Sequence, residues 1–193
     1  MSMEMKKHGS KDIVVGCGDL YVCLASEFKV GETTREAMTN LGYIHEDGAT
    51  FKRSTEVTPI SSANRGVVDY SYSKYTTEFD AKMISLSKDH FTTYTTGSDV
   101  TELENGCYRI LGCESDRPKK LALCFSGTDE DTGAVFDLYM PSVSWVPELE
   151  LAFNGTDPIA LNMHFNCANV ELPNGKYGSY YLETNMGVDA TEA

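Results

Sequence analysis

The feature that most constrains the fold of this chain is a period-two alternation of apolar and polar residues that recurs in several segments. It is clearest between Pro158 and Cys167, where apolar side chains occupy every second position: Ile159, Leu161, Met163, Phe165 and Cys167. This alternation indicates a strand with one face on a core and the other toward solvent. A turn sequence at 154–157 and a second alternating segment before it predict a β-hairpin over 148–167.

The same pattern predicts further strands along the chain. Segments 120–125 and 136–140 alternate on either side of a turn-rich linker, and segments 49–59, 67–75 and 76–85 are predicted to share one antiparallel sheet. Segments 13–15 and 19–24 predict a short hairpin. One short helix is predicted, with Ser87 as N-cap and Gly97 as its C-terminal stop. The predicted fold class is all-β with one short helix, as an antiparallel β-sandwich or a partly open barrel.

The charge of the chain excludes several classes of partner. Asp and Glu outnumber Lys and Arg by 29 to 16, which gives a net charge of −13. Tight nucleic-acid binding relies on basic groups that neutralise phosphates, and anionic membranes repel an acidic surface. The sequence also has no apolar run of the roughly 20 residues that a membrane helix needs, and no secretory signal. We therefore expect a protein made in the cytoplasm that binds neither nucleic acid tightly nor membranes.

The residue types that usually form metal and catalytic sites do not occur in this sequence at the spacings that such sites require. None of the six cysteines forms a CxxC pair, and the four histidines include no HExxH pair. The acidic turn at 129–131 lacks the spacing of an EF-hand loop, so a solvated hairpin tip is favoured over a calcium site. Glu148 and Glu150 could form a glycosidase-like carboxylate pair, although acidic outward residues are expected in an acidic protein. We predict no metal, no cofactor and no enzymatic activity.

Two segments show no clear periodicity. Residues 26–40 form a long polar loop, and long loops in compact domains are often binding elements. Residues 169–193 have little amphipathic order and are predicted to form a partly mobile C-terminal arm. The remaining chain, 1–168, is predicted to be one β domain whose residues 1–11 are flexible.

The order of four segments resembles the tail tube (major tail) proteins of long-tailed bacteriophages. These segments are a glycine-punctuated hairpin at 12–22, a Gly-Tyr-Ile…Gly-Ala entry to a long strand at 41–56, a strand leading into a short helix at 78–91, and a closing strand at 147–155. The resemblance covers roughly residues 12–167. It implies a β-sandwich or partly open barrel that forms stacked hexameric rings, whose inner strands join into a channel for DNA.

The resemblance also implies where the protein acts and with what. Its partners would be copies of itself and other tail proteins at the tube ends, and its place would be the tail of the virion. Two alternatives stay open. One is another β-sandwich phage assembly protein, such as a capsid decoration or tail-completion protein. The other is a carbohydrate-binding or hydrolytic β-sandwich, which needs exposed aromatic residues or paired carboxylates.

Two sets of site residues follow from the resemblance combined with the alternation. Phe79, Ala81 and Met83 are expected to face the core. The residues expected to line the channel lie on the opposite face and on neighbouring strands: Glu78, Asp80, Lys82, Asp69, Ser71, Ser73 and Glu56. The loop residues expected to contact the adjacent ring are Phe28, Lys29, Val30, Glu32, Arg35 and Met38. Deletion of residues 28–38 is predicted to leave a folded monomer that no longer polymerises.

Overall fold

The computed structural model describes residues 18–84, 98–104, 106–112, 119–129, 134–146 and 160–185. Apart from a 3-10 turn at Arg35–Ala37, their regular structure consists of strands, and the paired strands are antiparallel. The strands are β1 (Gly18–Leu24), β2 (Thr39–Asn40), β3 (Ile44–Ser62), β4 (Gly66–Met83), β5 (Ser98–Glu102), β6 (Tyr108–Gly112), β7 (Lys120–Asp129), β8 (Ala134–Val146), β9 (Leu161–Cys167), β10 (Val170–Glu171), β11 (Tyr177–Gly178) and β12 (Tyr181–Thr184). The predicted all-β, antiparallel fold class is confirmed. The predicted helix at 87–97 and the strands predicted at 13–15 and 148–153 lie outside the described residues.

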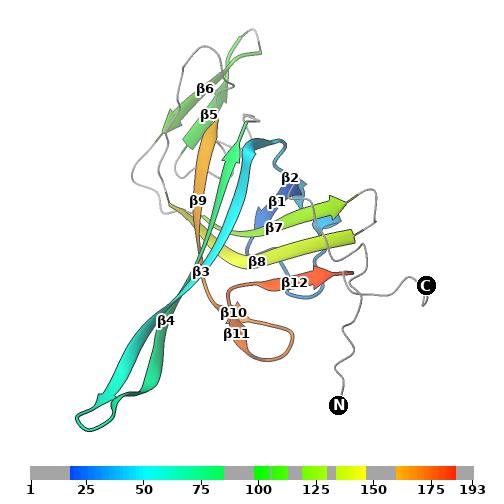
Figure 1. The fold of residues 1–193 in the computed structure, drawn as a ribbon. Helices are drawn as coiled ribbons and strands as arrows, with labels where there is room; N and C mark the ends of the chain where they lie inside the picture. Colours follow the sequence, from blue (N-terminus) through cyan, green and yellow to red (C-terminus); the bar gives the residue numbers. More distant parts are fainter. Residues whose placement is uncertain are drawn as a thin grey trace.

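The strands of the main sheet follow the order β2-β1-β7-β8-β9-β4-β3, with β12 also paired to β8 (Figure 1). Residues 136–139 of β8 pair with β12, and residues 143–146 pair with β9. Strand β8 therefore connects two leaves, a first leaf of β2-β1-β7-β8-β12 and a second leaf of β9-β4-β3. The leaves contact each other through aromatic pairs, with ring centroids 6.0 Å apart for Phe79–Phe125 and 4.9 Å for Phe51–Tyr180. The arrangement is sandwich-like.

The hydrophobic core lies between the two leaves. Phe79, Ala81 and Met83 of β4 are buried, which confirms the predicted inward face of this strand. Residues of both leaves complete the cluster, including Leu20, Leu123, Met140, Leu161, Met163 and Phe165. Trp145 is also buried. Buried apolar residues at every second position on paired strands are the packing that the alternation predicted.

A second cluster covers the other face of the first leaf. The alternation at 120–125 leaves Ala122 and Cys124 on the face away from the core, yet both are fully buried. Phe28 and Met38 of the loop at 26–40 pack over them together with Tyr139. The first leaf is therefore covered on both faces, and the loop belongs to the body of the protein.

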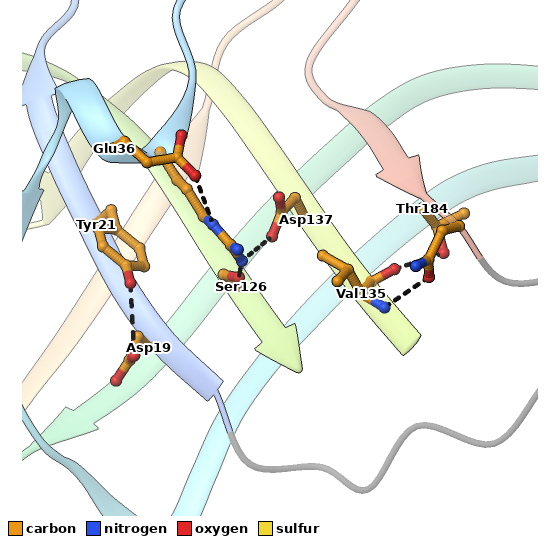
Figure 2. A network of polar contacts seen from close by, with 9 residues as sticks. Asp19, Tyr21, Glu36, Ser126, Val135, Asp137 and Thr184 are labelled. Atoms are coloured by element: carbon orange, nitrogen blue, oxygen red, sulfur yellow. Dashed lines mark hydrogen bonds and ion pairs between the residues drawn. The ribbon is translucent and has the colours of Figure 1, made fainter. Parts of the chain in front are cut away.

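The C-terminal region differs from its prediction over residues 169–185. Strand β12 pairs with β8, and the Tyr181 ring stacks on Tyr139 with centroids 4.9 Å apart. The Val135 amide donates to Asn185 Oδ1 at 2.8 Å, and Thr184 Oγ1 donates to the Val135 carbonyl at 2.7 Å (Figure 2). These contacts make 169–185 part of the β domain, so the predicted domain boundary at 168 is corrected.

Strands β3 and β4 are much longer than the others and form one hairpin. Segments 67–75 and 76–85 were predicted as separate strands, but one strand, β4, runs through both and ends at Met83. The predicted place of these segments in one antiparallel sheet with 49–59 is confirmed over the described residues. Strand β9 supports β4 only between Glu78 and Met83. Residues 53–77 therefore form a two-stranded finger that projects from the body (Figure 1). Its length is roughly 30 Å at about 3.4 Å per residue.

Thiol chemistry gives a first test of this packing. Burial raises the pKa of the Cys124 thiol to about 12, and burial together with the nearby Glu78 raises that of Cys167 to about 12. Because the thiolate is the reactive form, neither should react with iodoacetamide at pH 8, whereas the exposed Cys107 should react readily. Peptide mapping by mass spectrometry measures this. Equal labelling of Cys107 and Cys124 in the native protein would contradict the buried position of Cys124.

Candidate functional site

A β-bulge at Lys74 organises the finger. Thr55 lies opposite Tyr75, and the next residue, Glu56, lies opposite Ser73, so Lys74 is an extra residue in β4. Its φ of +52° is in the left-handed region, which is uncommon for a residue with a side chain. An extra residue shifts the period of two by one position, so the side chains of β4 exchange faces at this point.

The bulge gives the finger two faces of opposite character. Residues that lie directly opposite each other in an antiparallel pair share a face. One face, which we call the polar face, carries the pairs Glu56–Ser73, Thr58–Ser71 and Ile60–Asp69. The other, which we call the tyrosine face, carries the pairs Thr55–Tyr75, Val57–Tyr72 and Pro59–Tyr70.

The channel-lining residues predicted from the sequence come together on the polar face and its continuation. The continuation on the second leaf pairs Lys52 with Glu78 and Thr50 with Asp80, and Lys82 follows on the same face. Simple alternation along one strand places Asp69 and Glu78 on opposite faces, and the bulge at Lys74 is what brings them together. The polar face therefore runs from the finger onto the body.

Contacts between charged groups on this continuation are local. Lys52 Nζ lies 4.0 Å from Glu78 Oε2, and Asp80 hydrogen-bonds to His164 Nδ1 across the β4–β9 pair. The Glu78 and Asp80 side chains remain about one third and one half exposed. This part of the second leaf is a solvated face, in agreement with the alternation of polar residues in β4 and β9.

The tyrosine face is continuous with the core side of the sheet, because the Phe51–Phe79 and Arg53–Thr77 pairs precede it on the same face, and Thr77 is buried against Ser179. Beyond Thr77 no second leaf of the described residues covers it, and Val57, Tyr70, Tyr72 and Tyr75 are 47–61% exposed. Sequence reasoning missed this surface. The tyrosine spacing could have indicated this surface. It changes from two residues between Tyr70 and Tyr72 to three between Tyr72 and Tyr75, and this extra residue marks the bulge.

The loop residues predicted to contact an adjacent ring lie differently from expected. Phe28 and Met38 are buried, and the Phe28 ring lies 6.2 Å from that of Tyr139. Val30 packs against the same cluster. These apolar side chains cover the first leaf of their own chain, so their predicted role as apolar contacts to another ring is corrected. Lys29 and Glu32 are exposed and form an ion pair with each other at 3.5 Å.

Arg35 fixes the loop to the body through polar contacts. Its Nη1 lies 3.2 Å from Asp137 Oδ1 and also donates to Ser126 Oγ, while Nε donates to Glu36 Oε1 at 3.2 Å (Figure 2). Asp137 and Ser126 are buried on β8 and β7. Removal of residues 28–38 would therefore expose Ala122 and Cys124 and leave Asp137 without its cation. We now expect that deletion to unfold the first leaf.

A single substitution tests this anchor. Arg35→Ala leaves the buried Asp137 carboxylate without its cationic partner, and we expect it to lower the free energy of unfolding by about 1–3 kcal/mol. Thermal unfolding should show this as a loss of about 2–4 °C in Tm per kcal/mol. Lys29→Ala is the control, because it breaks an exposed ion pair and should cost below about 0.5 kcal/mol. Equal losses from the two variants would contradict the anchoring role of Arg35.

The described residues contain no group of three His, Cys, Asp or Glu side chains that could hold a metal ion. The same part of the chain includes no helix with the length and apolar character of a membrane span. In the comparisons with known proteins, neither a protein-family model nor a curated protein sequence matches this chain. The finger and its two faces are therefore the features of the described residues that bear on function.

Proposed function

We propose that this chain is a structural subunit that assembles with copies of itself into stacked rings, forming the tube of a phage tail. The observation that carries the proposal is the two-faced finger, with a tyrosine face that nothing covers in the described part of the chain and a polar face continuous with the body. The resemblance of segments 12–22, 41–56, 78–91 and 147–155 to tail tube proteins agrees with it.

The finger needs a partner on physical grounds. A two-stranded hairpin alone is marginally stable in water, and among the described residues only β3 and β4 pair along the finger. Its exposed apolar side chains form a contiguous row, and such rows mark protein–protein contact sites. Packing the tyrosine face against another subunit would stabilise both the hairpin and the assembly.

The polar face suits the wall of a channel for DNA. With its continuation it carries the carboxylates of Glu56, Asp69, Glu78 and Asp80 against the lysines Lys52 and Lys82. Repetition of this face around a ring would give a solvated wall with a net negative charge. Such a wall repels phosphates along the whole path, so DNA would pass without adhering to it.

A carbohydrate-binding module is the second candidate, and the exposed Tyr70, Tyr72 and Tyr75 are the observation in its favour. Aromatic rings in a row can stack on sugar rings. Binding on a glycan array that is lost in Tyr72→Ala, by a protein that remains monomeric, would support this candidate over assembly.

Electron microscopy of the purified protein tests the proposed function. We expect negative-stain images to show stacked rings or tubes with a central channel, and light scattering to show particles of many subunits. Isolated trimers would favour a capsid decoration protein. A monodisperse monomer across the accessible concentration range would contradict assembly of any kind.

A further inference from the structure

The body of the protein contains an apolar pocket at the base of the finger. Its volume is about 230 Å³, and it lies between the two leaves. Phe51 and Phe79 line it from the second leaf, Phe125 and Phe136 from β7 and β8, and Tyr180 and Leu182 from the C-terminal segment. Protein interiors are close-packed, and an apolar cavity of about 150 Å³ is enough to hold a benzene molecule. The pocket therefore has room for an aromatic side chain.

The tyrosine face has the side chains that such a pocket accepts. Tyr72, which is 61% exposed, lies opposite Val57, six residues along β3 from the pocket residue Phe51. At about 3.4 Å per residue, Tyr72 is roughly 20 Å from the pocket of its own chain. The finger points away from the body (Figure 1), so its outer tyrosines reach a pocket only in another molecule.

We propose that the tyrosine face of one copy's finger docks into the apolar pocket of a second copy. This inference rests on the proposed self-assembly and names the surfaces that perform it. The two surfaces are different patches of the same chain, so each copy donates a finger and also receives one. Head-to-tail interfaces of this kind close into rings or extend into filaments, and both outcomes fit a tube.

Charge complementarity supports a second copy as the occupant. Residues 53–77 carry Arg53, Arg65 and Lys74 against Glu56 and Asp69, a net charge of +1. Because the whole chain carries −13, the remaining residues carry −14. The finger is thus a weakly cationic segment of an acidic protein, and opposite charges steer its approach to the body of another copy.

Two variants that each damage one surface test the docking. Tyr72→Asp places a charge on the finger, and Leu182→Asp places one on the exposed rim of the pocket, where Leu182 is 44% exposed. Each should weaken assembly by at least about 30-fold, as expected when a buried anchor is lost from an interface. Circular dichroism and Tm should show that both remain folded. Tyr177→Asp is the matched control, because Tyr177 is 76% exposed on β11 and belongs neither to the tyrosine face nor to the pocket lining, so this variant should assemble normally.

Mixing the two defective variants gives the sharpest result. The Tyr72→Asp copy keeps an intact pocket, and the Leu182→Asp copy keeps an intact finger, so together they should form 1:1 dimers that cannot grow. Normal assembly of either variant, or a mixture that stays monomeric, would overturn the docking while leaving self-assembly of the wild-type protein in place. A monomeric wild-type protein would overturn both the docking and the proposed function.

Discussion

Replacement of Tyr70 and Tyr72 by serine should abolish assembly while leaving the body of the protein folded. Both tyrosines are exposed on the tyrosine face, opposite Pro59 and Val57 and beyond the part of β4 that pairs with β9. Serine removes the aromatic rings that we expect to anchor the contact and leaves the pairing of β3 with β4 unchanged. Sedimentation velocity should show a monomer at concentrations where we expect the wild-type protein to form large particles. Circular dichroism should retain the β spectrum, because the finger contributes little to the core.

Ser71→Ala combined with Ser73→Ala is the matched control for this variant. These two residues lie on the same stretch of β4 but on the polar face, opposite Thr58 and Glu56. Because the tyrosine face is untouched, we expect normal assembly. Assembly of the Tyr70→Ser/Tyr72→Ser variant at the wild-type concentration would show that the tyrosine face is not needed.

Charge reversal on the polar face should make the assembled tube adhere to DNA. Glu56→Lys combined with Asp69→Lys changes two exposed residues on the finger, where substitutions cost only about 0.5 kcal/mol in stability. Repeated around a ring, the new lysines would line the channel and bind phosphates. Fluorescence anisotropy with a short DNA duplex should detect binding at about 50 mM salt that is lost near 200 mM, because release of condensed counterions drives it.

The control for the charge reversal changes the same net charge at another place. Glu27→Lys combined with Glu32→Lys alters two exposed residues of the loop at 26–40. Because these positions lie on the body and not on the polar face, the control tubes should bind the duplex much more weakly. Equal binding by the two double variants would attribute the effect to net charge and contradict a channel lined by the polar face.

The β4–β9 part of the fold was predictable because one face of each strand meets the core. Phe79, Ala81 and Met83 and their neighbours on β9 follow a period of two, and burial enforces that period. The alternation failed at Ala122 and Cys124 because the cover on their face comes from Phe28 and Met38, about 90 residues away in sequence. Strand β12 was missed for a similar reason, since its four residues become a strand by pairing with the distant β8.

From the sequence, the polar-face residues could each be assigned to a solvated side of a strand, but their arrangement as one surface could not be predicted. Glu56, Asp69 and Glu78 were each assigned to a solvated face, and the structure places them on one face. That arrangement depends on the bulge at Lys74, which is defined by the register between two strands and not by local propensity. The projection of the finger beyond the body depends on where β9 ends, which the sequence of β3 and β4 does not contain.

In the proposed assembly the finger uses its tyrosine face for contact between subunits and its polar face for a channel. A cryo-electron microscopy map of the assembled wild-type protein would show both faces at once. We expect Glu56, Asp69, Glu78 and Asp80 to line a central channel, with Tyr70 and Tyr72 buried against a neighbouring copy. A map with the polar face on the outer surface, or with the finger free in solvent, would contradict it.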